Sequence, residues 1–262
     1  MSSANINGTE LYFERLGSGP SLLFLNGTGA TVANASPLLT VFARTFEVVA
    51  FDQRGIGRSA LPDGPYTMAD LAADALDLAD HLGWEHFRLA GVSFGGMVAQ
   101  EVAVTAPDRL DRLALLCTSS GGAGGASFPL HELAGMDPAE VSAQILDTRF
   151  TPDWLEHHDG DRALASLMAQ RSTTDKSEDE RKGEELQLGA RRGHDVYDRL
   201  PRITCPTLVA SGRYDGIAPA ANGEAIARQI PNATMRLFEG GHLFFLQDSL
   251  AFPAILHFLT SD

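Results

Sequence analysis

The sequence is poor in cysteine, and it lacks both a long apolar run and a basic, apolar N-terminus. Its two cysteines, Cys117 and Cys205, each end an apolar run, and two are too few for a disulfide framework or a metal site. We expect both to be buried free thiols. No apolar stretch reaches the ~18 residues that a membrane span needs, and no signal peptide is visible, so a cytoplasmic protein is the default expectation.

Positive charge is also scarce. Lysines and arginines number 20 against 34 aspartates and glutamates, which gives a formal net charge of −14. This balance argues against binding to nucleic acid, which normally needs a basic patch, and against binding to an anionic membrane surface. It does not determine the oligomeric state, and it leaves a homodimer open.

The sequence does contain enough apolar residues for the core of one α/β domain. The chain has 262 residues, of which 44% are hydrophobic. The periodic pattern of 66–82, ended by Gly83, predicts a helix. Strands that alternate with such helical patterns indicate a parallel sheet with helices on both faces. The predicted strands cover 11–16, 21–25, 46–51, 86–90, 110–117, 207–211 and 234–238, and a closing helix covers 252–259.

The stretch from 119 to 200 interrupts this alternation. Its parts are a serine- and glycine-rich segment typical of a flexible linker, two helix-like segments and a highly charged segment, at 119–125, 137–149, 161–170 and 175–192. We interpret 119–200 as a helical cap inserted into a core that is formed by 1–118 and 201–262. A second independent domain is the alternative, and the short stretch, embedded between strands, disfavours it.

The most informative segment is 91–95, which reads G-x-S-x-G with Ser93 at its centre. A predicted strand precedes it and a segment of helical character, 97–104, follows it, which is the context of a nucleophile elbow. Glycines without a Cβ permit the tight turn that exposes the serine hydroxyl. A chance match in a glycine-rich loop is the alternative, and the order of strand, turn and helix disfavours it.

A serine hydroxyl is a weak nucleophile at neutral pH, so it needs a base and a third group that orients the base. After Ser93 we expect an acid and then a histidine, each at the end of a later strand. Asp215 and His242 meet this condition, and together with Ser93 they are the predicted catalytic triad. Alone, such an aspartate is usually a turn residue. The other histidines lack this context and are expected to be structural or solvated: His81, His86, His131, His157, His158, His194 and His257.

An oxyanion hole needs backbone N–H groups that point at the developing negative charge. We expect one from Phe94, the residue after the nucleophile, and one from Thr28 in the glycine-rich loop that follows strand 21–25. An ordinary glycine turn is the alternative for this loop. Two more residues of the loop and one of the elbow helix are candidates for the substrate pocket, although the last can equally belong to the core: Asn26, Gly27 and Met97.

Over nearly its whole length the chain resembles the α/β-hydrolase superfamily. Residues 51–59 are similar to the family's D-x-R-G-x-G-x-S loop. Residues 91–100 resemble the elbow of the branch that contains enol-lactonases, cofactor-free haloperoxidases (perhydrolases) and small carboxylesterases. The resemblance implies an α/β-hydrolase fold with a mostly parallel eight-stranded sheet and a helical lid. It also implies that Ser93 is the nucleophile, His242 the base and Asp215 its orienting acid.

One position departs from the family's pattern, since Asn26 stands where the oxyanion loop usually has histidine. An asparagine side chain can still form hydrogen bonds that hold the loop. Because the donors of the hole are backbone groups, we expect the hole to be kept.

The combined prediction is a serine hydrolase, without cofactor or metal, that cleaves a small carboxylic ester or lactone through an acyl-enzyme. Hydrolysis of a C–C bond and perhydrolysis, in which peroxide replaces water, use the same triad and stay open. A non-catalytic receptor for a small ligand is a further alternative, because a fold does not determine function. Four arginines of the predicted lid can meet a substrate carboxylate, although such residues are usually solvated: Arg149, Arg171, Arg191 and Arg192.

Overall fold

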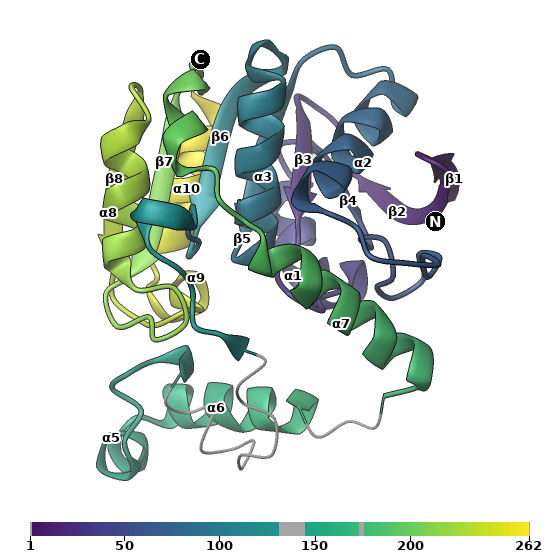
Figure 1. Cartoon of the computed structure of the whole chain (residues 1–262). Coiled ribbons are helices and arrows are strands. Elements are labelled where there is room, and N and C mark those ends of the chain that lie inside the picture. Colours follow the sequence, from purple (N-terminus) through teal and green to yellow (C-terminus); the bar gives the residue numbers. More distant parts are fainter. Residues whose placement is uncertain (1, 131–144, 173–175, 262) are drawn as a thin grey trace.

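A computed structural model of the chain describes residues 2–130, 145–172 and 176–261 (Figure 1). Its eight-stranded sheet has the order β1-β2-β4-β3-β5-β6-β7-β8. The pairs β1–β2 and β2–β4 are antiparallel, and the other neighbouring pairs are parallel. The strands are β1 Ser2–Ile6, β2 Thr9–Leu16, β3 Ser21–Leu25, β4 Glu47–Phe51, β5 Phe87–Val92, β6 Leu110–Leu116, β7 Thr207–Gly212 and β8 Ala233–Phe238.

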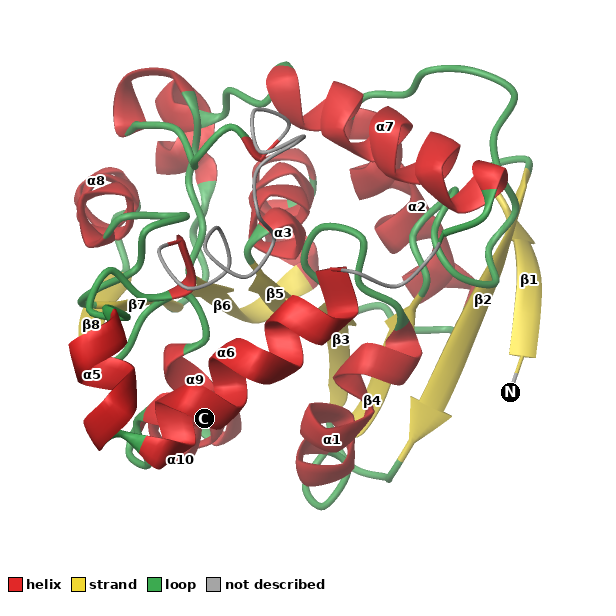
Figure 2. Ribbon diagram, turned by 90° about the horizontal axis from the view of Figure 1, so that it is seen from below, coloured by secondary structure: helices red, strands yellow, loops and turns green. Residues whose placement is uncertain are grey.

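Helices cover both faces of the sheet. One face carries α2, α3 and α8, and the other carries α1, α9 and α10. Three further helices, α5, α6 and α7, follow β6 and lie across the end of the sheet, as Figure 2 shows. The bounds are α1 Val32–Phe42, α2 Met68–His81, α3 Phe94–Thr105, α5 Pro152–His157, α6 Asp159–Ser172, α7 Glu178–Arg192, α8 Ala220–Gln229, α9 Phe244–Gln247 and α10 Ala251–Thr260.

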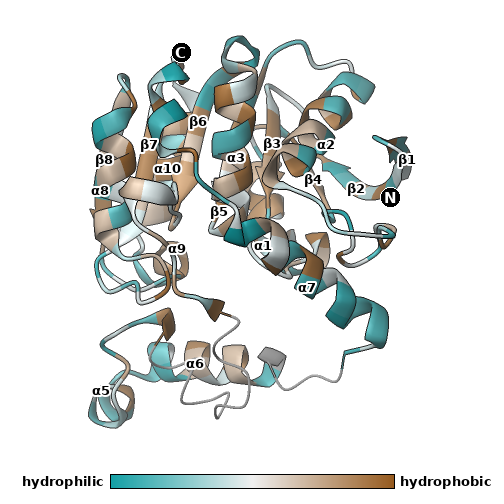
Figure 3. Cartoon of the chain, in the orientation of Figure 1, coloured by the Kyte–Doolittle hydropathy of each residue, from teal (hydrophilic) through white to brown (hydrophobic). Residues whose placement is uncertain are grey.

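Strand β3 shows why the central strands are hydrophobic along most of their length (Figure 3). Its side chains alternate between the two faces of the sheet. Leu23 and Leu25 pack into the cluster under α2 and α3, whereas Leu22 and Phe24 pack into the cluster under α1 and α10. All four are at most 1% exposed, because helices cover both faces.

Helix α2 illustrates how local signals set an element's start. Thr67 and Asp70 form a capping box, in which each side chain accepts a hydrogen bond from the other residue's backbone N–H. The apolar residues Leu71, Ala75 and Leu78 then recur on the buried face.

The predicted mostly parallel eight-stranded sheet, with helices on both faces, is confirmed. Cys117 and Cys205 are buried and free, as predicted. Strand β1 and helix α1 were not predicted: β1 has no apolar run, since only Ala4 and Ile6 are apolar, and Pro37 lies inside α1. Among the described helices, none has the length and apolar character needed to cross a membrane.

Two predictions for the inserted region need correction. The segment 119–125 is no flexible linker, because Ser119 and Ser120 are at most 1% exposed. Of the predicted helix 137–149, residues 137–144 lie outside the described part of the structure, 145–146 are helical, and 147–149 are not. The helix predicted at 161–170 is confirmed within α6.

Candidate active site

Ser93 lies in a sharp turn between β5 and α3. Its backbone has φ +54° and ψ −116°, a conformation that is rare outside glycine and marks local strain. Its N–H donates to Leu116 O over 2.8 Å, which fixes the turn against β6. A Cβ at Gly91 would overlap the carbonyl oxygen of Gly95, and a Cβ at Gly95 would overlap that of Leu25. The turn therefore requires glycine on both sides of the serine.

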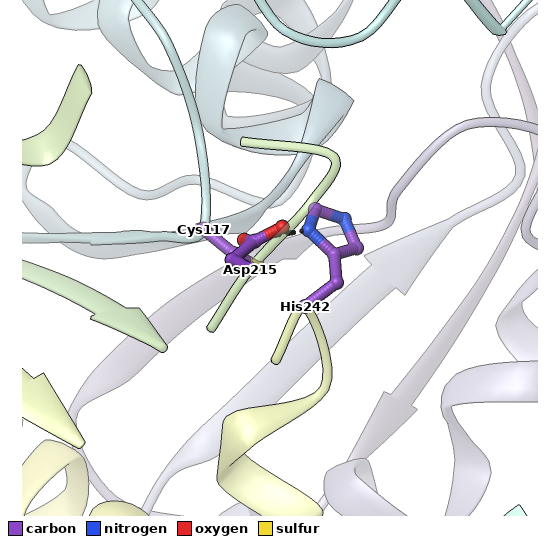
Figure 4. Close-up of side chains that lie close together, drawn as sticks. All are labelled: Cys117, Asp215 and His242. Atoms are coloured by element: carbon purple, nitrogen blue, oxygen red, sulfur yellow. Dashed lines mark hydrogen bonds and ion pairs between the residues drawn. The ribbon is translucent and has the colours of Figure 1, made fainter. Parts of the chain in front are cut away.

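Asp215 and His242 meet at the carboxyl ends of β7 and β8. His242 Nδ1 lies 2.8 Å from Asp215 Oδ2, and both residues are buried (Figure 4). Asp215 Oδ1 accepts hydrogen bonds from the N–H groups of Ile217 and Ala218, both at 2.8 Å. Because an ionised carboxylate only accepts, His242 Nδ1 carries the proton and Nε2 is left as a proton acceptor.

Residues 145–148 hold the loops of Asp215 and His242 in place through backbone hydrogen bonds. Leu146 O accepts the N–H of His242 over 2.5 Å, and Ile145 O accepts the N–H of Gly216 over 3.1 Å. The N–H of Thr148 donates to Tyr214 O over 2.8 Å. The positions of the histidine and the aspartate therefore depend on this segment as well as on the sheet.

Cys117 borders all three predicted triad residues. It follows Leu116, which accepts the N–H of Ser93, and its sulfur lies within 4.8 Å of the nearest ligand atoms of Asp215 and His242. Three such groups can form a metal site. Burial, and then the charge of Asp215, raise the pKa of this thiol well above its usual value, so the sulfur keeps its proton and is a poor metal ligand.

The structure does not join Ser93 to His242 by a hydrogen bond, and both residues are described. Catalytic hydrogen bonds are often long in enzymes without substrate and tighten when it binds. The strand ends bring the three residues to one edge of the sheet, and the direct contact between the aspartate and the histidine is the one that the structure contains.

The two predicted oxyanion donors keep their N–H groups available. Within the described residues, the N–H of Thr28 and the N–H of Phe94 donate to no protein acceptor. A Cβ at Gly27 would lie 3.6 Å from Ser93 Cβ, so the loop passes beside the nucleophile. Asn26 is buried, and its side-chain Nδ2 has no partner in the described structure.

Two glutamines that sequence reasoning missed hold this loop from outside. The N–H of Gly29 donates to Gln187 Oε1 over 2.7 Å, and Gln187 Nε2 donates to Gln53 Oε1 over 3.3 Å. Gln53 Nε2 in turn donates to Asn26 O over 3.1 Å. Gln187 is 1% exposed, so helix α7 fixes the candidate oxyanion loop through a buried polar chain.

Known proteins share this architecture. A family model described as the alpha/beta hydrolase fold matches residues 20–249. The chain is 31% identical, over 242 residues, to a poly(3-hydroxyalkanoate) depolymerase from Ectopseudomonas oleovorans, an alignment that covers 92% of this chain and 84% of that protein. The chain belongs to the α/β-hydrolase family.

Two more similarities agree with this assignment. A 3-oxoadipate enol-lactonase 2 from Acinetobacter baylyi is 27% identical over 89% of this chain and 85% of its own length. The crystal structure of the enol-lactonase from Burkholderia xenovorans LB400 superimposes with a TM-score of 0.82, covering 99% of this chain and all of that one, and its 24% identity shows the fold alone. Like the named relatives, this α/β-hydrolase is an enzyme.

A cavity of about 260 Å³ adjoins the elbow helix of the hydrolase. Met97, one turn after Ser93, lines it, whereas Asn26 and Gly27, the other two residues predicted for the substrate pocket, are not among its lining residues. The segment that starts at Ser119 and the C-terminal end of α7 form the other walls. The lining residues are Met97, Ser119, Gly121, Gly122, Ala126, Ser127, Pro129, Leu188, Arg191, Arg192 and His194.

Replacement of Gln187 by methionine should slow the hydrolase. The variant keeps the side-chain volume but leaves the N–H of Gly29 and Gln53 Oε1 without partners, so we expect a loss of about 1–3 kcal/mol in unfolding free energy. The loosened loop carries Thr28, a predicted oxyanion donor, so kcat should fall by about tenfold, because oxyanion stabilisation depends on preorganised donors. Ester hydrolysis and urea unfolding check this, with Glu185→Gln, an exposed change on the same helix, as the control. Unchanged kcat in Gln187→Met would contradict the role of Gln187 in holding the candidate oxyanion loop.

Acid should destabilise the folded hydrolase through His194. This residue is 7% exposed, and its Nε2 donates to Ser119 O over 3.2 Å. Burial lowers the pKa of His194 from 6.5 to about 4, and the nearby Glu101 opposes this shift while Arg199 adds to it. Between these two pH values the unfolded chain binds a proton that the folded chain does not, so stability falls as the pH falls.

The loss from pH 7 to pH 4 should reach about 3 kcal/mol. Urea unfolding at the two pH values measures it in the wild type, in His194→Gln and in His86→Gln, an exposed histidine variant. We expect the loss of unfolding free energy between pH 7 and pH 4 to be about 3 kcal/mol smaller in His194→Gln than in the wild type and in His86→Gln. Equal losses in all three proteins would show that His194 is not responsible.

Proposed function

We propose that this α/β-hydrolase is a serine hydrolase that cleaves a small carboxylic ester or lactone through an acyl-enzyme. The observation that carries the proposal is the buried contact of 2.8 Å between His242 Nδ1 and Asp215 Oδ2, at the same sheet edge as the strained serine turn. Ser93 is the proposed nucleophile. The helices α5–α7 belong to the proposed cap, 119–200, over a core of 1–118 and 201–262.

The chemistry follows from the positions of the protons. His242 Nε2 takes the proton of Ser93 Oγ as this oxygen attacks the carbonyl carbon, and Asp215 stabilises the imidazolium that forms. The N–H groups of Phe94 and Thr28 donate to the oxyanion. His242 then gives its proton to the leaving alkoxide. A water molecule attacks the acyl-enzyme, loses its proton to His242, and the acid leaves as Ser93 Oγ recovers the proton.

A panel of substrates tests the proposal against its alternatives. We expect the wild type to hydrolyse p-nitrophenyl butyrate and simple lactones, and to react with a fluorophosphonate probe at Ser93. A β-diketone and peroxide with acetate serve as substrates for C–C hydrolysis and perhydrolysis. If the wild type turns over the β-diketone, or peroxide with acetate, faster than the esters and lactones, that reaction replaces ester hydrolysis as the proposed function. Tight binding of a small ligand, with no turnover of any substrate and no labelling, would favour a receptor.

A further inference from the structure

Two arginines line the cavity beside Met97, in a protein whose net charge is −14. Arg191 and Arg192 line it, and none of the lining residues that the structure describes is acidic. His194 adds no charge near neutral pH, because burial lowers its pKa to about 4. An excess of cationic groups around a concave site favours an anionic ligand.

Arg191 differs from the other arginines that the sequence analysis singled out. Arg149 forms an ion pair of 2.7 Å with Asp147, and its guanidinium lies over the rings of Trp154 and Tyr214. Arg192 is exposed, and the side chain of Arg171 lies outside the described part of the structure. The guanidinium of Arg149 is therefore already paired within the protein. Arg191 is the partly buried arginine that remains as a candidate for binding an anionic ligand.

The guanidinium of Arg191 has no acidic partner among the described residues. One of its N–H groups donates to Phe128 O over 2.7 Å, which anchors it between the cavity residues Ser127 and Pro129. Burial lowers the pKa of Arg191, and no neighbouring charge opposes this effect. A partly buried cation without a counter-ion is unfavourable, so an anion that enters the cavity is stabilised there.

Two hydrogen bonds connect the wall of the cavity to the backbone of Ser93. Met97 follows Ser93 by one turn of α3, a rise of roughly 6 Å, and its N–H donates to Ser93 O over 3.2 Å. Thr118 Oγ1 also donates to Ser93 O, over 2.8 Å, and the next residue, Ser119, lines the cavity. Met97, which contacts the backbone of Ser93, and Ser119, which follows such a contact, therefore place the cavity wall beside the turn that carries the nucleophile.

We propose that Arg191 binds a carboxylate of the substrate while the ester or lactone carbonyl lies at Ser93. The inference rests on the proposed hydrolase function and narrows its substrates to half-esters of short dicarboxylic acids and to small lactones that carry a free carboxylate. Arginine suits this ligand because its planar guanidinium can donate two parallel hydrogen bonds to a carboxylate. The carboxylate takes no part in bond making or breaking, so Arg191 binds and orients the substrate.

Two ethyl esters test the proposal, since monoethyl succinate and ethyl butyrate differ only by a carboxylate in place of a methyl group. Their hydrolysis is followed by pH-stat titration. We expect Arg191→Gln to lower kcat/KM for monoethyl succinate on the order of 10- to 100-fold, the effect of losing a charge-assisted hydrogen bond. The same variant should hydrolyse ethyl butyrate within about twofold of the wild-type rate.

Lys182→Gln is the matched control, because it removes an exposed cation from the same helix. We expect it to leave both esters unaffected, which separates a contact at Arg191 from a change in net charge. Equal losses for both esters in Arg191→Gln would indicate a structural role and overturn the proposal. Unchanged hydrolysis of monoethyl succinate would overturn it as well.

Binding of succinate, measured by calorimetry in the Ser93→Ala background, separates this proposal from the hydrolase function. We expect Arg191→Gln to weaken that binding at least about tenfold. If the esters are not hydrolysed but succinate binding depends on Arg191, the hydrolase proposal fails and the carboxylate site stands. If the esters are hydrolysed and succinate binding does not depend on Arg191, the carboxylate site fails alone. Inorganic phosphate that binds as tightly as succinate would overturn the assignment to a carboxylate.

Discussion

Ser93→Ala should lower kcat for p-nitrophenyl butyrate by at least about 10⁴-fold, because the acyl-enzyme cannot form without the nucleophilic oxygen. Substrate binding should be kept, since the proposed oxyanion donors are backbone groups. Folding should be kept too, because alanine and serine meet the same backbone restriction at φ +54°. Steady-state assays of the purified variant measure the loss of kcat, and circular dichroism checks the fold.

The labelling of the serine gives an independent readout of the same change. A fluorophosphonate probe should modify the wild type and Ser36→Ala, an exposed serine variant on α1, but not Ser93→Ala. Mass spectrometry locates the adduct. Activity of Ser93→Ala within tenfold of the wild type, or a probe adduct on another residue, would show that the nucleophile is elsewhere.

The parts of the fold that were predictable are those where burial leaves a local pattern. Strand β3 has an uninterrupted apolar run because both faces of the sheet are covered, and its predicted bounds, 21–25, agree with the structure. Strand β1 has no such pattern, since it pairs only with β2 at the sheet edge and most of its side chains are exposed. Helix α1 was hidden by the proline inside it.

The candidate site divides in the same way. Ser93, Asp215 and His242 could be selected as candidates because each follows a recognisable strand, and the ends of parallel strands meet at one edge. Gln187 could not, because it contacts Gly29 across 158 residues of sequence and neither residue carries a motif for that contact. His194 was assigned a structural or solvated role, and only the folded chain places it at the cavity wall.

The inserted region was the least predictable part, for a physical reason. The charged helix α7 has few apolar residues to show which face is buried, and it packs through Gly183, whose missing side chain lets it approach Gly55. Small residues at a close contact leave no hydrophobic signal in the sequence. The distinction between Arg149, which pairs with Asp147, and Arg191, which does not, likewise needs the folded structure.

Asp215→Asn should lower kcat by about 10⁴-fold although the side chain keeps its shape. In the wild type, Oδ1 accepts two backbone N–H groups and Oδ2 faces His242 Nδ1. The same two donors should fix the amide oxygen of asparagine on their side, which turns its NH₂ group toward His242. The histidine must then accept at Nδ1 and carry its proton on Nε2, so it cannot take the proton of Ser93.

Asp215→Ala distinguishes this tautomer effect from the simple loss of a carboxylate. Alanine imposes no donor on His242 Nδ1, so the imidazole keeps access to the productive tautomer and the variant should be more active than Asp215→Asn. Asp108→Asn, an exposed change away from the site, is the matched control and should keep the wild-type kcat. If Asp215→Asn instead retains more activity than Asp215→Ala, the aspartate acts by shape and packing, and another group must orient the histidine.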